Sequence, residues 1–232
     1  MDIRFLGHAT FELSEGDARV LIDPFLAANP KAAVGPDEVD PTHILLTHGH
    51  VDHVADAVDI AKRTGAHCVA LVETANWLGK QGVDDVSDPN LGGTVQFDWG
   101  WVKLVQALHS SELPDGTVTK ESGLVVNIGG TTVYHLGDTC LFGDLKLIAE
   151  RTPVDVALVP IGGHYTMDRH DAVVAAELLG AKTIIPCHYN TFPLIETDAE
   201  AFKSEVESRT SSTVVILQPG ETHTAGAPQQ VG

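Results

Sequence analysis

Three histidines and one aspartate are concentrated in a single six-residue stretch of the chain, His48-Gly49-His50-Val51-Asp52-His53. Neutral imidazoles and carboxylates are the ligands that a borderline divalent ion such as zinc prefers. Four such groups could serve two metal ions if other side chains complete each coordination shell. The alternative is a His-rich surface loop that binds metal adventitiously. We favour a metal site, because strand and helix patterns frame the stretch.

The stretch lies at a predicted turn from a strand into a helix. The apolar run at 44–47 is typical of a buried strand, and Asp52 and His53 begin the helical pattern that follows. Such a turn places His48 and His50 on the loop and the other two side chains on the first helical turn. The four side chains can therefore converge on one point.

Three further ligand-type residues directly follow other apolar runs, namely His109, Asp138 and His188. Because strand ends meet at one rim of a sheet sandwich, all three could face residues 48–53. Each also has an ordinary alternative: a histidine at a strand end is often a hydrogen-bonded loop residue, and Gly-Asp-Thr is often a helix N-cap, with Thr139 capping a helix that starts near Leu141. Together they are favoured as ligands, because residues 48–53 need more of them.

The composition indicates one globular domain. The chain has 232 residues, of which 43% are hydrophobic, enough for a packed core, and its longest apolar runs are too short to cross a bilayer. Three scattered cysteines suggest no disulfide framework, and the N-terminus enters strand-like sequence without a secretory signal. We therefore expect a reducing, cytoplasmic location and no membrane insertion.

The net charge of −18, from 32 acidic and 14 basic residues, opposes binding to nucleic acid or to anionic membranes. A small-molecule substrate is expected instead, including an anionic one, because two divalent ions would make the site locally positive. The acidity is also compatible with life at high salt. The sequence leaves homo-oligomerisation open.

The predicted elements form two similar halves of a single domain, residues 1–232, with a break near 110–123. In each half, hairpin-like strands come first and strand–helix units follow. One strand is expected over Ile3–Leu13, and the tail after Thr222 is expected to be loose. This order suggests two packed sheets with helices outside, an α+β protein. A dinucleotide-binding fold is disfavoured, because no Gly-x-Gly-x-x-Gly turn follows a strand.

The combined pattern resembles the metallo-β-lactamase superfamily. The His-x-His-x-Asp-His signature stands at 48–53, Asp23 lies upstream of it, and His109, Asp138 and His188 follow in the order of the superfamily. The resemblance covers essentially the whole chain. It implies a four-layer αββα sandwich with the site in a cleft at one rim.

Two further segments, 6–11 and 160–167, look like a little-characterised branch of metal-dependent hydrolases. That branch is related to ascorbate-phosphate lactonase and to N-acyl-phosphatidylethanolamine phospholipase D. One subclass of antibiotic-cleaving members has a cysteine where this chain has Asp138. The chain also lacks the large inserted domain of the RNA-cleaving members. Both departures argue against β-lactamase and nuclease activity.

The resemblance also implies the coordination of two divalent ions, most simply Zn²⁺, with Mn²⁺, Fe²⁺ or Ni²⁺ as alternatives. One ion would be held by His48, His50 and His109 and the other by Asp52, His53 and His188, with Asp138 bridging them. Two metals about 3.5–4 Å apart can hold a bridging hydroxide at neutral pH and polarise a carbonyl or phosphoryl oxygen. Asp52 would orient that hydroxide as well as bind metal.

Four other residues are assigned supporting roles. Asp23 is expected to hold a ligand histidine or the backbone of the metal-binding turn, although a plain turn aspartate before proline explains it equally well. His8 and His164 sit beside glycine at predicted strand ends, where either could protonate the leaving group or bind a substrate anion. Tyr165 could contribute a hydroxyl to the same pocket. The alternative for both histidines is a structural role.

Three classes of function follow. The favoured one is an enzyme, a dinuclear-metal hydrolase of a small ester, lactone or phosphodiester. The second is a nuclease or RNA-processing enzyme, which would need a basic track that the sequence does not show. The third is a non-catalytic metal-binding module. It predicts a missing or blocked ligand, yet all seven ligand positions are filled.

Overall fold

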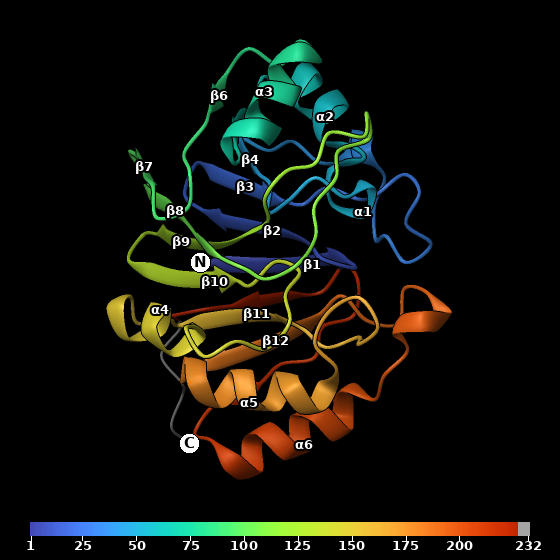
Figure 1. Ribbon diagram of the computed structural model, residues 1–232. Helices are drawn as coiled ribbons and strands as arrows, with labels where there is room; N and C mark the ends of the chain where they lie inside the picture. Colours follow the sequence, from blue (N-terminus) through green and yellow to red (C-terminus); the bar gives the residue numbers. More distant parts are fainter. Residues whose placement is uncertain (227–232) are drawn as a thin grey trace.

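A computed structural model describes residues 1–226 of the chain, and its strands form two seven-stranded sheets (Figure 1). The first sheet has the order β14-β1-β2-β3-β4-β5-β6. Its strands, in chain order, are β1 (Asp2–Gly7), β2 (Thr10–Glu15), β3 (Ala18–Ile22), β4 (His43–Leu45), β5 (His67–Val69), β6 (Val86–Ser87) and β14 (Thr222–Thr224). β2 pairs antiparallel with both β1 and β3. From β3 through β4 and β5 to β6, each strand pairs parallel with the next.

The second sheet, of order β13-β12-β11-β10-β9-β8-β7, repeats this plan. Its strands are β7 (Thr94–Phe97), β8 (Gly100–Gln106), β9 (Ser122–Ile128), β10 (Thr131–His135), β11 (Val156–Pro160), β12 (Thr183–Cys187) and β13 (Thr213–Val214). Again antiparallel hairpins come first and parallel strands follow. The chain passes from the first sheet to the second at 88–93. The sequence suggested a break between two similar halves near 110–123, and that division stays a prediction.

Helices cover the outer face of each sheet, as Figure 1 shows. Those beside the first sheet are α1 (Val51–Val54), α2 (Ala57–Thr64) and α3 (Val72–Lys80), and those beside the second are α4 (Leu145–Arg151), α5 (Arg169–Leu179) and α6 (Ala199–Arg209). Short 3₁₀ turns lie at Pro36–Glu38 and Pro193–Ile195. None of the helices within residues 1–226 is long and apolar enough to cross a membrane.

Three separate apolar clusters hold the layers together. One lies between the sheets and includes Phe11 and Leu124, one packs the second sheet against α4–α6, and one packs the first sheet against α1–α3. Alternation along β9 explains the division, because Leu124 and Val126 face the other sheet while Val125 faces the helices. The predicted four-layer αββα sandwich is confirmed.

Several predicted element boundaries were wrong. The single strand expected over Ile3–Leu13 is a hairpin, because Gly7 and His8 have φ of 113° and 58° and reverse the chain. The helix expected near Leu141 begins at Leu145, so Thr139 does not cap it. The tail after Thr222 was expected to be loose, but Thr222–Thr224 pair with β1; the rest of that prediction concerns 227–232, outside the described residues.

Candidate metal centre

The predicted site residues lie at the carboxyl ends of strands from both sheets. His8 follows β1, Asp23 follows β3, and residues 48–53 run from the end of β4 into α1. Three more follow strands of the second sheet, namely His109 after β8, Asp138 after β10 and His188 after β12. The two sheets meet along their inner faces, so these strand ends share one rim.

Three overlapping groups of ligand atoms form at this rim, and one of them, Asp23, His48 and His53, shares its histidines with the other two. His48, His50 and His109 offer ring nitrogens that all lie within 4.8 Å of one another, and Nε2 of His48 is 3.0 Å from Nδ1 of His50. Asp52, His53 and His188 form a second group, which His8 joins. These are the two trios that the sequence resemblance implied.

Asp138 lies between the two trios. Its Oδ1 is 3.4 Å from Nε2 of His53, and its Oδ2 is 3.1 Å from Nε2 of His188 and 3.5 Å from Nε2 of His109. The carboxylate is only 3% exposed. One carboxylate therefore faces ligand nitrogens of both groups.

The buried polar atoms of this cluster fit a cation. Nε2 of His53, Oδ1 of Asp138 and both ring nitrogens of His188 have no hydrogen-bond partner among the described residues. An unpaired buried polar atom is costly, and most such atoms in folded proteins are satisfied. Divalent metal ions would satisfy lone pairs that converge in this way, and the donor set of imidazoles and carboxylates suits zinc.

Charge interactions shift the pKa values of the cluster in opposite directions. Burial acts most strongly on His188 and lowers its pKa, but Asp138 and Asp52 outweigh burial and raise that pKa to about 9. For Asp138 burial acts in the other direction and raises the pKa, but the nearby His188 and His53 outweigh burial and bring that pKa well below the usual range. In the other trio burial prevails instead and lowers the pKa of His48 and of His109.

Asp23 connects the cluster to the strand below it. Its Oδ2 is 2.7 Å from Nδ1 of His53 and accepts a hydrogen bond from the Thr47 hydroxyl, while its Oδ1 accepts from the Thr47 backbone N–H. A carboxylate at one ring nitrogen fixes the tautomer and leaves the other nitrogen free to bind metal. Asp23 thus lies where its predicted supporting role requires. The sequence placed Thr47 at the end of the predicted strand and gave no sign of its contact with Asp23.

His8 is fully buried behind Asp52. Its Nε2 is 3.0 Å from Oδ2 of Asp52, and its Nδ1 is 2.8 Å from the hydroxyl of Thr191. Burial, with His188 nearby, lowers the pKa of His8 to about 4. His8 is not among the described residues that line the cavity above the cluster. Its contacts therefore suit the positioning of Asp52.

His164 and Tyr165 lie further out, after β11. Both are exposed, and their rings contact each other edge-on with centroids 4.5 Å apart. Tyr165 lines the cavity above the cluster, and within the described chain His164 does not. The roles predicted for these two residues remain predictions, and the geometry favours that of Tyr165.

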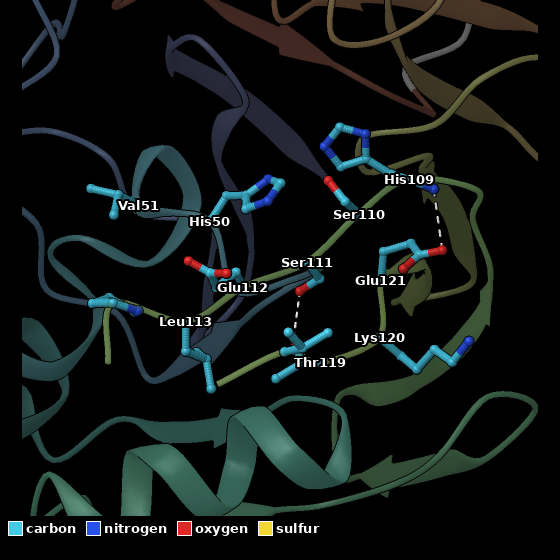
Figure 2. Close-up of a pocket in the computed structure, with 12 residues that line it drawn as sticks. His50, Val51, His109, Ser110, Ser111, Glu112, Leu113, Thr119, Lys120 and Glu121 are labelled. Atoms are coloured by element: carbon cyan, nitrogen blue, oxygen red, sulfur yellow. Dashed lines mark hydrogen bonds between the residues drawn. The ribbon is translucent and has the colours of Figure 1, made fainter. Parts of the chain in front are cut away.

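Two adjoining cavities open onto the cluster. The first, of about 610 Å³, is lined by Asp52, Asp138 and His188 together with apolar side chains. The second, of about 680 Å³, is formed by the loop between β8 and β9 and includes Glu112, Lys120 and Glu121. His50 and His109 line both cavities, and Figure 2 shows them at one end of the second.

The loop between β8 and β9 packs against the proposed metal-binding turn at 48–53. The sequence did not reveal these contacts. The Gly49 N–H donates to the Ser111 hydroxyl. That hydroxyl contacts the Thr119 hydroxyl, as Figure 2 shows. The His109 N–H donates to Glu121. A side chain at Gly49 would meet Leu113 at 3.0 Å, so glycine in the signature permits this close packing.

The fold and the ligand arrangement define a metallo-hydrolase centre of the metallo-β-lactamase type, and comparison with known proteins agrees. A model of the beta-lactamase superfamily domain matches residues 2–188, so this chain belongs to that superfamily. Within it, the chain belongs to the UPF0173 family of metal-dependent hydrolases. The predicted superfamily and the predicted class of enzyme are thus confirmed at the level of the family.

Two relatives and one solved structure illustrate this similarity. The UPF0173 metal-dependent hydrolase of Methanopyrus kandleri is 49% identical and spans 96% of this chain and 99% of its own. That of Symbiobacterium thermophilum is 45% identical over 97% of this chain and all of its own. The structure of Igni18, a metallo hydrolase from Ignicoccus hospitalis, superposes with a TM-score of 0.87 at 35% identity and covers 96% and 97% of the two chains.

Proposed function

We propose that this chain is a dinuclear-metal hydrolase that cleaves a small ester, lactone or phosphodiester. The observation that supports the proposal is the convergence of seven His and Asp side chains from both sheets beneath an open cavity, with buried polar atoms that have no hydrogen-bond partner in residues 1–226. His48, His50 and His109 would hold one ion and Asp52, His53 and His188 the other, while Asp138 would contribute to both. Bound divalent ions would activate water and polarise the scissile carbonyl or phosphoryl group.

The remaining chemistry belongs to the side chains of the protein. Asp52 is one-third exposed and opens onto the cavity, where its carboxylate can accept a hydrogen bond from the attacking water. His8 holds Oδ2 of Asp52 from behind, and Asp23 holds His53. The Tyr165 hydroxyl lies on the cavity wall, where it could donate to the substrate. Such positioning of groups before reaction accounts for much of enzymatic catalysis.

The two other classes of function are less well supported. A nuclease needs cations along the path of the nucleic acid, yet the described residues that line the first cavity include neither lysine nor arginine, and the net charge is −18. A non-catalytic metal module should have a blocked or incomplete site. In this chain all seven proposed ligand positions carry His or Asp, and the proposed centre opens onto a cavity.

A substrate panel tests the proposal. The zinc-reconstituted protein should hydrolyse at least one member of a set of activated esters, lactones and bis(p-nitrophenyl) phosphate. The Asp52→Ala variant, purified in parallel, should not. If reconstituted protein and variant were equally inactive on the whole set, or equally active, the proposed hydrolase would be wrong.

A further inference from the structure

Apart from the proposed metal ligands and Ser110, the first cavity is lined by apolar and aromatic side chains. This apolar wall consists of Phe25, Ala28, Val51, Tyr165, Phe192 and Leu194. The carboxylates in the lining, Asp52 and Asp138, both belong to the proposed metal centre. A charged substrate group placed against this wall would therefore lose water without gaining a partner.

The aromatic side chains of this wall are held in place by ring–ring contacts. Phe25 is 4% exposed, and its ring lies 6.4 Å from that of Phe192 between centroids. Both rings also contact the His8 ring, at 5.7 and 5.6 Å. His8 in turn holds Asp52, so the apolar wall and the proposed centre share one packed unit. An apolar group on this wall would lie directly beside the scissile bond.

The rim of the wall leaves apolar surface uncovered. Leu194 is 59% exposed and Val51 57% exposed, and both face the same cavity. Exposed apolar surface of this kind marks binding sites when it lies in a concave region. A cavity of about 610 Å³ is in the range that holds a small ligand. The concavity and its continuity with the metal ligands favour a small molecule over a second copy of the chain.

The second cavity differs in character, because Glu112, Lys120 and Glu121 give it charged groups of both signs. His50 and His109 stand between the two cavities. A substrate that spans the centre thus meets a cavity without charged groups beyond the proposed ligands on one side and a cavity with charged groups on the other.

We infer that the substrate is a neutral ester or lactone whose acyl side is an apolar alkyl or aryl group, held against Phe25, Phe192 and Leu194. The inference rests on the proposed hydrolase function and narrows it, since it selects esters and lactones over phosphodiesters with flanking charges. Leu194 is then a residue that determines specificity. Its exposure lets it be replaced without a loss of core packing.

A series of p-nitrophenyl esters from acetate to octanoate tests this inference with the zinc-loaded protein. We expect kcat/KM to rise with chain length, by at most about fourfold per buried methylene. Leu194→Ser should lower kcat/KM for the octanoate ester roughly tenfold and make the rise with chain length less steep. Leu147→Ser is the matched control, because Leu147 is 55% exposed on α4 and lines neither cavity.

Calorimetric binding of straight-chain carboxylates, from acetate to octanoate, gives a readout that does not depend on turnover. Affinity that rises with chain length in the parent and in Leu147→Ser, and less steeply in Leu194→Ser, would support the apolar site even if no ester were cleaved. That failure would concern the proposed function alone. Ester cleavage and carboxylate binding without dependence on chain length would overturn the inference. So would a Leu194→Ser variant that changed only the oligomeric state in sedimentation, since a second copy would then cover this surface.

Discussion

Asp138 is the residue on which the proposed dinuclear arrangement depends most. Both of its oxygens face ligand histidines, and those histidines come from different trios. It caps no helix in the described structure, because α4 begins at Leu145, after Asp144. A capping role, which the Gly-Asp-Thr sequence also suggested, would have made it a matter of local stability only.

Replacement of Asp138 by alanine should therefore abolish turnover and reduce the bound metal below the parent level, while the fold is kept. The reason is that each ion would lose an oxygen ligand. Metal analysis, turnover and circular dichroism of Asp138→Ala check this. Two metals and normal turnover in the variant would refute the bridging role.

His8 gives a second prediction at this scale. Since its Nε2 is engaged by Asp52 and its ring is buried, we expect His8→Ala to keep its metal and to lower kcat for good and poor leaving groups alike. A general acid would behave differently: its loss typically costs about 10²–10⁴-fold, mostly for poor leaving groups. Comparison of p-nitrophenyl and alkyl esters distinguishes the two. A defect confined to alkyl esters would show that His8 is the acid.

At the scale of elements, the ends of the strands carry unusual backbone conformations. His8, Asp23 and His188 have φ of 58°, 47° and 52°, in the left-handed region that residues with a side chain seldom adopt. Each directs a side chain into the centre from a turn after β1, β3 or β12. Such conformations concentrate at functional sites, because the surrounding structure must hold them in place.

The sequence allowed some residues of the proposed centre to be predicted and not others. The proposed metal-binding turn at 48–53 could be singled out because its His and Asp residues are neighbours in the chain, and His109, Asp138 and His188 because each follows an apolar run. The turn at His8 could not, since alternation continues through it. The contacts of Thr47 with Asp23 and of Ser111 with Gly49 join distant segments, and no local pattern reports such contacts.

A pH-dependent contact lies at the other end of β4. His43 Nε2 accepts a hydrogen bond from the Trp99 indole, and burial, with His67 nearby, lowers the pKa of His43 although Asp85 opposes this. A lowered pKa means that the folded state binds fewer protons than the unfolded one. The contribution of neutral His43 to the free energy of unfolding is therefore complete above pH 6.5 and is lost as the pH falls below 6.5.

His43→Asn should thus show a smaller loss of unfolding free energy between pH 7 and pH 5 than the parent does. Urea unfolding at the two pH values measures the difference. The variant removes the titrating group and leaves the metal site five residues away intact, so the ester turnover at pH 7 serves as the control. Equal losses in the parent and in the variant would exclude His43 as a source of acid sensitivity.

At the scale of the whole molecule, the proposed centre connects the two sheets. His48, His50, Asp52 and His53 follow β4 of the first sheet, whereas His109, Asp138 and His188 follow strands of the second. The sheets also meet through an apolar cluster and through hydrogen bonds, such as those that the Ser122 N–H and hydroxyl donate to the Thr47 carbonyl. Metal bound between them would therefore stabilise the folded chain as a whole.

Removal of metal should lower the thermal midpoint. An ion present at 100 times its Kd adds about 2.7 kcal/mol to the free energy of unfolding, which corresponds to roughly 5–11 °C for a chain of this size. Differential scanning calorimetry before and after chelation, and again after zinc is restored, measures the shift. An unchanged midpoint would show that the ligand side chains do not bind metal between the sheets.

The most direct test of the dinuclear centre is the metal content of the purified protein. After reconstitution with zinc and removal of free ions, inductively coupled plasma mass spectrometry should find about two zinc ions per chain, as expected for a two-metal hydrolase. The His48→Ala and His188→Ala variants, each of which disrupts one trio, should each bind about one. A parent protein that held only trace metal after reconstitution would contradict the dinuclear centre.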